Sequence, residues 1–258
     1  MKIRYLAIVF LILLPCRDAF ADPAKGLEVA IRVDAADSGW KDEEVQAKMT
    51  LVAANGRTVT RVLRTRNLEM TGDGDRSLVV FDRPRDVKGT VFLTHAHKKG
   101  NDDQWLFLPS LKRVKRISSS NRSGPFMGSE FAYEDISSEE VERYTYDYLG
   151  TERVAGLECH VYERVPVDLQ SGYSRQVVYA DTDHFRVLKI EYYDRKGSHQ
   201  KTLTRTDYRK IEGFWRAGRW EMVNHLNKKK TIVDWHDWKF ATGLTRRQFE
   251  KNALATYR

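Results

Sequence analysis

The feature that most constrains the fold is a long series of short segments in which apolar and polar residues alternate, separated by turn residues. Alternation with a period of two is typical of β-strands that bury one face. One pair is joined by Asn55-Gly56, a dipeptide typical of tight β-hairpins. The pattern predicts strands over residues 45–53, 58–66, 77–81, 89–95, 104–108, 157–165, 175–180, 185–194, 200–208, 220–227 and 230–240.

The connections between these segments are short, which bears on the fold class. Without helical crossovers the strands are expected to form one large antiparallel sheet. Helical spacing is found over residues 23–37, 131–144 and 245–255. Two or three helices cannot cover both faces of such a sheet, but they can plug a single sheet that has curled on itself. We therefore predict an α+β fold with no internal domain boundary.

The N-terminal residues have the pattern of an export signal. Lys2 and Arg4 precede an apolar stretch over residues 6–14, and Ala19-Phe20-Ala21 follows. A charged start, an apolar stretch too short to cross a bilayer and an A-x-A site predict a cleavable secretory signal. The expected division is a signal over residues 1–21, cleaved after Ala21, and a single mature domain over residues 22–258. An uncleaved N-terminal anchor is the alternative.

Charge and cysteine content follow from that division. Lys and Arg outnumber Asp and Glu by 44 to 36, and the signal carries two of the eight excess positive charges. In an exported protein a basic surface favours anionic lipid headgroups, an acidic protein surface or an acidic glycan as partners over nucleic acid.

Cleavage removes Cys16 and leaves only Cys159, so no internal disulfide is expected. Cys159 lies in a predicted strand and is expected to be a buried, inert thiol.

Three of the predicted strands are apolar at consecutive positions rather than at alternate ones. They contain Val79-Val80-Phe81, Val91-Phe92-Leu93 and Trp105-Leu106-Phe107-Leu108. A sheet with one solvated face would alternate, so both faces of these strands must be covered, or one face must line a cavity. An ordinary two-sided core and a ligand-binding concavity both remain open at this point.

Two charged or polar groups have competing interpretations. The run Lys112-Arg113-Val114-Lys115-Arg116 can be a solvated strand edge that resists aggregation, or a contact for phosphate headgroups or an acidic transporter loop.

His95 and His97, with Asp102 or Asp103 nearby, could bind a metal ion, but no third ligand is identifiable. Motifs of serine hydrolases, zinc proteases and phosphate-binding loops are absent. We therefore expect no cofactor and no enzymatic activity.

The middle of the chain resembles the outer-membrane lipoprotein-sorting family, specifically the LolA-like proteins that are often encoded beside RND-type lipid exporters. The matching pieces are Phe81-Asp82-Arg83-Pro84, Gly89-Thr90, Asp103-Gln104-Trp105-Leu106, Leu108-Pro109, Lys112-Arg113-Val114-Lys115-Arg116-Ile117 and Gly128-Ser129-Glu130-Phe131. The resemblance implies a half-open antiparallel β-barrel, with a few helices covering the open side and an apolar cavity for acyl chains.

In function, the resemblance implies a periplasmic carrier that takes a lipoprotein, lipid or glycolipid towards the outer membrane. The implied partners are an inner-membrane exporter of RND or ABC type and an outer-membrane acceptor. The first alternative is an accessory protein that docks on an RND-type transporter through the basic run and carries nothing. The second is a metal-assisted or acyl-transferring hydrolase built on His95 and His97.

Such a carrier would need an apolar wall, because each methylene removed from water stabilises the complex by about 0.8 kcal/mol. The segment 118–129 has the composition of a loop and is expected to act as a mobile lid. Lys112, Arg113, Lys115 and Arg116 are the expected headgroup or partner contacts. The candidates for the wall and lid, for which simple core packing is the alternative, are Val80, Phe81, Phe92, Trp105, Phe107, Phe126, Met127, Phe131 and Tyr133.

Overall fold

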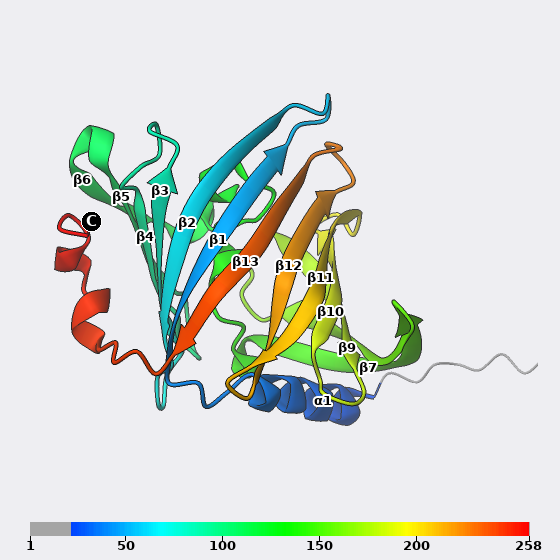
Figure 1. The fold of residues 1–258 in the computed structure, drawn as a ribbon. Coiled ribbons are helices and arrows are strands. Elements are labelled where there is room, and N and C mark those ends of the chain that lie inside the picture. The colour runs from blue at the N-terminus through cyan, green and yellow to red at the C-terminus, as the bar shows by residue number, and fades with distance from the viewer. Residues whose placement is uncertain (1–21, 258) are drawn as a thin grey trace, which may run out of the picture.

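The computed structural model describes residues 22–257, which form one antiparallel sheet of 13 strands and one α-helix (Figure 1). The strands lie in the order β6-β5-β4-β3-β2-β1-β13-β12-β11-β10-β9-β8-β7. Their bounds are β1 Asp42–Val52, β2 Thr58–Leu68, β3 Arg76–Arg83, β4 Val91–His95, β5 Asp103–Leu108, β6 Arg113–Ile117, β7 Tyr144–Val154, β8 Leu157–Pro166, β9 Tyr173–Asp181, β10 Val187–Asp194, β11 His199–Ile211, β12 Phe214–Asn224 and β13 Lys230–Phe240.

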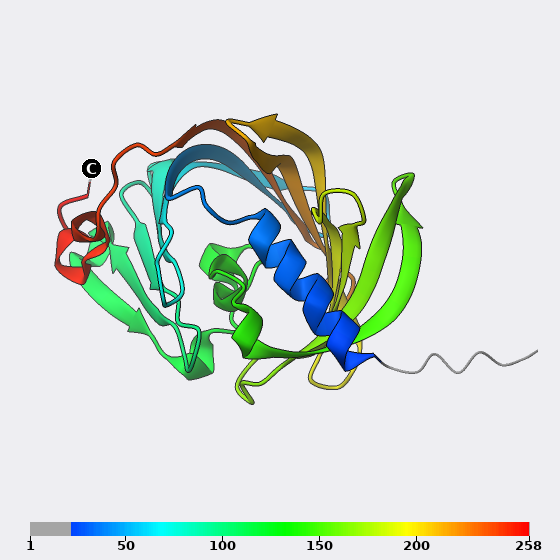
Figure 2. The ribbon, with the colours of Figure 1, turned by 90° about the horizontal axis from the view of Figure 1, so that it is seen from below.

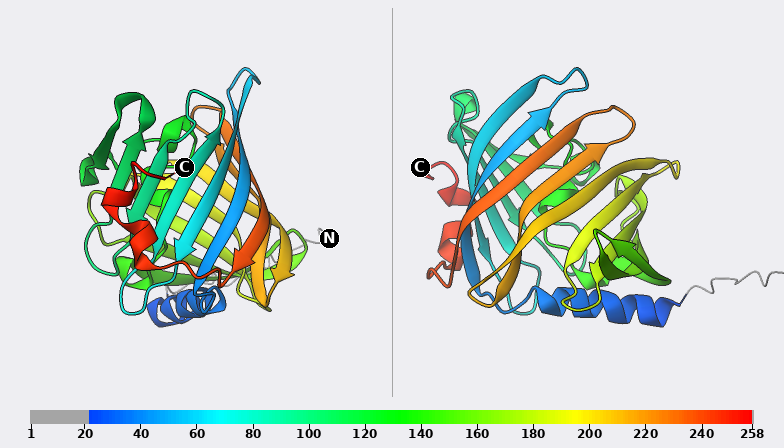
Figure 3. Two further views of the ribbon diagram at one scale, coloured as in Figure 1. Left: turned by 60° about the vertical axis from the view of Figure 1, so that its left-hand side comes forward. Right: turned by 45° about the vertical axis from the view of Figure 1, so that its right-hand side comes forward.

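The predicted strands are confirmed, with their ends shifted by a few residues. β1 and β2 are joined through the predicted turn, where Gly56 has a positive φ of 83° that suits glycine. The sheet curls strongly but does not close, since β6 and β7 remain as its two edges (Figures 2 and 3). This is the half-open barrel that the resemblance implied.

Helix α1, Pro23–Ala36, lies across the open side of the curled sheet (Figure 2). Its start is specified locally, because the Asp22 carboxylate accepts a hydrogen bond of 2.9 Å from the Lys25 N–H and Pro23 occupies the first turn. The helix packs on β7 and buries Val29 and Ala30. This helix was predicted, and it is neither long nor apolar enough to cross a membrane; the described part of the chain contains no other candidate span.

The expectation of a helix over residues 131–144 is wrong. The chain there forms the short 3₁₀ helices η4, Tyr133–Ile136, and η5, Val141–Arg143, and residue 144 already begins a strand, β7, that was not predicted. Tertiary contacts override the helical spacing, because Glu134 binds the Gly172 N–H and Asp135 binds Lys201. The helical C-terminus is likewise reduced to η6, Arg246–Phe249, and η7, Lys251–Ala253.

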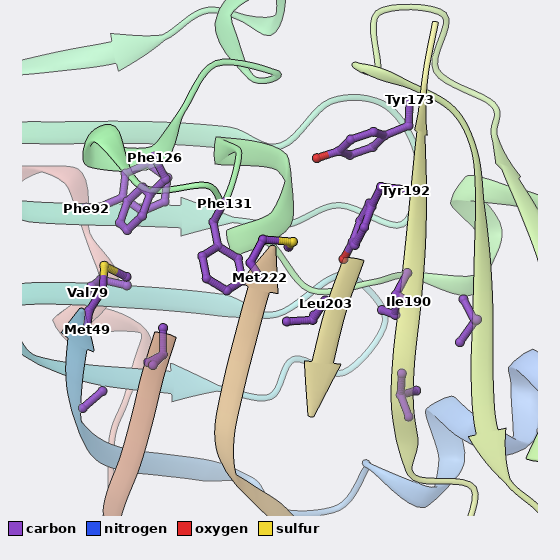
Figure 4. Packing of buried hydrophobic residues seen from close by; sticks show 14 of the residues in the cluster. Met49, Val79, Phe92, Phe126, Phe131, Tyr173, Ile190, Tyr192, Leu203 and Met222 are labelled. Atoms are coloured by element: carbon purple, nitrogen blue, oxygen red, sulfur yellow. The ribbon is translucent and has the colours of Figure 1, made fainter. Parts of the chain in front are cut away.

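The continuous apolar strands are explained by clusters on both faces of the sheet. Val79, Phe81 and Phe92 belong to a large cluster on the concave face (Figure 4). Their neighbours in the sequence point to the convex face, where the C-terminal residues Phe249 and Leu254 cover them. Both faces of β3 and β4 are therefore buried, and β5 has one buried and one half-buried face, in agreement with the pattern. Cys159 is fully buried, as predicted, and burial raises the pKa of its thiol.

The predicted signal, residues 1–21, lies outside the described residues.

Candidate functional site

A cavity of about 460 Å³ lies between α1 and the concave face of the sheet. Ala30 and Val33 of α1 form one side. The others are formed by residues of β1 to β3, β7, β8 and β10 to β13 and by residues between 126 and 141. A volume of this size is within the range of about 300–1,000 Å³ that is typical of pockets for single small ligands. Five of the six tryptophans of the chain line it: Trp40, Trp215, Trp220, Trp235 and Trp238.

Aromatic rings form the inner wall of the cavity. The rings of Trp220 and Trp235 meet edge to face with their centroids 5.3 Å apart, and Phe131 lies 6.4 Å from Trp220. Phe126 is also on the wall and packs 5.1 Å from Phe92 behind it (Figure 4). Such rings offer a large apolar area with little rotamer freedom, which suits contact with an acyl chain.

The segment of residues 118–143, which we name the plug, fills the rest of the concave face (Figure 2). It contains η2, Ser119–Asn121, and η3, Phe126–Gly128, as well as η4 and η5. On one side Asp135 binds Lys201 at 2.6 Å and the Tyr173 hydroxyl at 2.9 Å, and both ionic side chains are almost fully buried. These contacts hold the plug to β9 and β11.

Further contacts hold the plug at other points. Arg122 binds Asp168 at 2.5 Å, and Glu130 accepts a hydrogen bond of 2.7 Å from the Asn224 amide. The Arg61 guanidinium of β2 donates to the Met127 carbonyl at 2.5 Å. The expected lid, residues 118–129, is therefore attached to other parts of the chain at Arg122 and Met127, while several of its other residues are exposed. Its role as a mobile lid stays a prediction.

A group of three ionic side chains lines the inner end of the cavity. Glu139 accepts a hydrogen bond of 2.7 Å from Arg164, whose Nε in turn donates to Gln176. Arg205 is more distant, at 3.9 Å from Glu139. Burial would raise the pKa of Glu139, but the positive charges of Arg164 and Arg205 outweigh it and hold this pKa at about 2. The carboxylate is thus fully ionised and is shared between two cations.

The α1 end of the cavity is rich in carboxyl groups. Burial, with Glu140 and Glu69 nearby, raises the pKa of Asp75 to about 7. Burial and the neighbouring Glu140 also raise the pKa of Asp34. Both carboxyls line the cavity, and Asp75 keeps its proton in part near neutral pH.

The predicted wall residues separate into two groups. Phe81, Phe92, Phe126, Met127, Phe131 and Tyr133 meet in the concave cluster, and of these Phe126 and Phe131 line the cavity. In contrast, Val80, Trp105 and Phe107 lie on the convex face under the C-terminal segment. A role in the cavity wall does not fit these three residues, because alternate side chains of a strand point to opposite faces and their neighbours face inward.

The predicted basic contacts lie on the edge strand β6 and before it, far from the cavity lining. Lys112, Arg113 and Lys115 are exposed and form no ion pair with the described residues. Arg116 is bound to Asp103 of the neighbouring strand. The basic run therefore lies at an exposed edge of the sheet, as the first interpretation predicted. A contact between this run and a partner stays a prediction.

The two histidines of the metal hypothesis have other partners. His95 Nε2 is 2.7 Å from the carbonyl of Phe249 in the C-terminal segment. His97 is bound on one side to Asp73 at 2.8 Å and on the other to Asp103 at 3.3 Å. Within residues 22–257 no group of three potential ligands has the arrangement of a metal site.

The tryptophans on β12 and β13 are the site residues that sequence reasoning missed. Trp220, Trp235 and Trp238 lie within predicted strands, but none of them is among the predicted wall residues. The available signal was the concentration of four of the six tryptophans within residues 215–238. Their shared cavity depends on the curl of the sheet, which places β12 and β13 opposite α1.

Comparisons with known proteins identify a family model and solved structures that are similar to this chain. A family model described as an uncharacterized protein matches residues 73–256. A solved domain from Vibrio parahaemolyticus, named as an outer-membrane lipoprotein-sorting protein domain, is 50% identical, with a TM-score of 0.89 over 91% of this chain and 100% of its own. No curated protein matches the chain.

Two further solved structures share the fold. A DUF1329 family protein from Desulfovibrio piger is 33% identical, with a TM-score of 0.85 over 90% of this chain and 99% of its own. A LolA superfamily protein from Nitrosomonas europaea is 21% identical, with a TM-score of 0.71 over 88% of this chain and 98% of its own. The second of these shows the similarity of the fold alone.

Proposed function

Because this chain belongs to the family of outer-membrane lipoprotein-sorting domains with a LolA-like fold, we propose that it is a periplasmic carrier. It would bind the acyl chain of a lipoprotein or lipid in the cavity under α1 and take it towards the outer membrane. The observation that carries this proposal is the cavity of about 460 Å³, with an aromatic wall on the concave face of a half-open barrel. The predicted export signal over residues 1–21 supports the location.

The apolar part of the cavity accounts for affinity without directional contacts. Burying a chain of 14 to 16 carbons at about 0.8 kcal/mol for each methylene would give gross stabilisation on the order of 10 kcal/mol, before the cost of ordering the chain. Release then requires either an acceptor with a comparable apolar surface or a rearrangement of α1 against the sheet. No catalytic step is part of this proposal.

The test uses two tryptophan substitutions within one turn of α1, on different faces of the helix. Val33 lines the cavity, whereas Ile31 points outward and is half exposed. We expect Val33→Trp to fill the cavity and to reduce bound lipid at least tenfold, while Ile31→Trp leaves it unchanged. Each protein is purified from the native periplasm under mild conditions and extracted for lipid mass spectrometry. Absence of lipid from the unmodified protein, or equal loading of both variants, would refute the carrier proposal.

Delivery also requires contact with a membrane complex, for which the exposed edge strand β6 is the candidate. Lys112, Arg113 and Lys115 would face an acidic surface of an inner-membrane exporter of RND or ABC type. Reversing these three charges to glutamate should abolish co-purification of the exporter while lipid loading persists. Exporter binding by a protein that never contains lipid would instead favour the accessory role.

A further inference from the structure

Polar groups without partners are concentrated around the cavity. Within residues 22–257, nine buried side-chain nitrogen or oxygen atoms have no hydrogen-bond partner. Five of the nine belong to residues that line the cavity and have no ion-pair partner at the atom concerned. These residues are Thr65, Ser77, Ser137, Arg205 and Trp235. A sixth lining residue, Arg76, has its Nη1 3.7 Å from a Glu250 carboxylate oxygen in the C-terminal segment. Since buried polar groups in proteins are almost always bonded, the five remaining groups need partners that the folded chain itself does not supply.

The unpartnered atoms share one chemical property. The nitrogens of Arg205 and Trp235 can only donate, and the hydroxyls of Thr65, Ser77 and Ser137 can donate as well as accept. None of the five is an atom that can only accept. A ligand that satisfies them must therefore bring acceptor oxygens into an otherwise aromatic cavity.

Arg205 of β11 adds a positive charge to this set. Glu139 is engaged with Arg164 at 2.7 Å and lies 3.9 Å from Arg205, so one carboxylate faces two guanidinium groups. The Arg205 guanidinium stacks on the Trp220 ring, with its central carbon 4.5 Å from the ring centroid, and also lies beside the Tyr208 phenol. The Arg205 side chain is partly buried, and a partly buried charge with incomplete compensation carries a cost that an anion within hydrogen-bond distance would reduce.

We propose that the cavity takes an amphiphile with an oxyanionic headgroup, a carboxylate or a phosphate, and that Arg205 is the counter-ion of that headgroup. The inference rests on the proposed function and adds the class of headgroup to it. The carboxyl groups at the other end of the cavity are no obstacle. Asp34 and Asp75 belong to α1 and to the β2–β3 connection, whereas Arg205 lies on β11 beside Trp220. Asp37 and Glu43, which also line the cavity, are both paired with Arg216, at 2.5 and 3.0 Å.

The experiment compares three ligands with the same chain of 16 carbons: palmitate, hexadecyl phosphate and hexadecanol. Binding to the delipidated full chain is followed by intrinsic fluorescence, because five of the six tryptophans line the cavity. At least one of the two anions should bind tenfold or more tightly than hexadecanol, as expected for a charge-assisted hydrogen bond in a buried site. Which anion binds more tightly distinguishes a carboxylate from a phosphate headgroup.

Two substitutions on β11 test whether Arg205 causes the preference for the anionic ligands. Arg205→Met should remove the preference for the anion and leave hexadecanol binding unchanged. Arg209→Met, at an exposed position of β11, should retain the preference. Equal affinity of the unmodified protein for all three ligands would overturn the oxyanion site and leave the carrier intact. Binding of none of them would overturn the carrier itself, and neither result depends on the folding of a variant.

Discussion

At the scale of single residues, the α1 end of the cavity holds two neighbouring carboxyl groups whose pKa values are shifted in opposite directions. Burial raises the pKa of Asp75 to about 7. The hydrogen bond with His97 lowers the pKa of the exposed Asp73 to about 2, against a small opposing effect of burial. Two aspartates that are almost adjacent in the sequence therefore make opposite contributions to stability.

Asp75→Asn is expected to stabilise the protein at alkaline pH. The folded protein retains a proton on Asp75 that the unfolded chain releases above its ordinary pKa of 3.8. The free energy of unfolding therefore falls as the pH rises from about 4 to about 7. Asparagine removes this loss and keeps an oxygen for the Met70 N–H, so we expect a gain of about 1–3 kcal/mol at pH 8. Urea unfolding at pH 5 and pH 8 measures it.

The control for this prediction is Asp73→Asn. It removes a carboxylate that is favoured in the folded state, so it should not increase the free energy of unfolding at pH 8. If Asp75→Asn and the unmodified protein showed the same dependence on pH, the assignment of a buried, protonated carboxyl would be incorrect.

At the scale of the elements, α1 is positioned over the open side of the sheet by one close approach. A methyl group added at Gly26 would lie 2.9 Å from the backbone of Asp147 and Tyr148 in β7. The helix and the strand also meet where Asp22 and Tyr148 form an isolated bridge. Because α1 forms one side of the cavity, this packing determines the opening of the site.

Gly26→Ala is therefore expected to destabilise the protein, although alanine usually stabilises the interior of a helix by about 1 kcal/mol relative to glycine. Backbone atoms cannot yield as a flexible side chain can, so we expect a loss of about 1–3 kcal/mol. Chemical denaturation monitored by circular dichroism gives the value. The matched substitution Glu28→Ala, at an exposed position of the same helix, should have little effect. Stabilisation by Gly26→Ala would show that α1 does not pack this closely on β7.

At the scale of the whole molecule, the plug connects the two halves of the sheet. Phe126 packs against Phe81 and Phe92 of β3 and β4, and Asp135 binds Lys201 of β11. A sheet that is open at β6 and β7 has no hydrogen bonds to hold its curl closed. The plug therefore contributes to the curvature as well as filling the concave face.

Lys201→Met should weaken this connection. It leaves the buried Asp135 carboxylate without its cation, and the loss of one partner of a buried pair typically costs about 3–5 kcal/mol. We expect a loss of this size in thermal or urea unfolding and faster proteolysis within residues 118–143. Lys210→Met, at an exposed site on the same strand, should change neither measurement. Unchanged protection of the plug in Lys201→Met would mean that other contacts hold it.

Local patterns account for the parts of this protein that were predicted correctly. Alternation of apolar residues, the Asn55-Gly56 turn and the Pro23 start of α1 act within a few residues, so strands, hairpin and first helix could be predicted. The continuous apolar runs also showed that β3, β4 and β5 are covered on both faces. The contiguous resemblance supplied the half-open barrel and the family.

The tertiary structure alone decided which side chains share the cavity. Consecutive residues of a strand face opposite sides, so Phe81 and Val80 are equivalent as apolar residues but differ completely in position. Residues 131–143 became part of the plug because Glu134 and Asp135 found partners far away in the sequence, Gly172 and Lys201, which no local spacing encodes. The sequence by itself determined the strands, α1 and the family. The curl of the sheet decided the site, because it brings tryptophans of β12 and β13 opposite a helix that lies nearly 200 residues earlier in the chain.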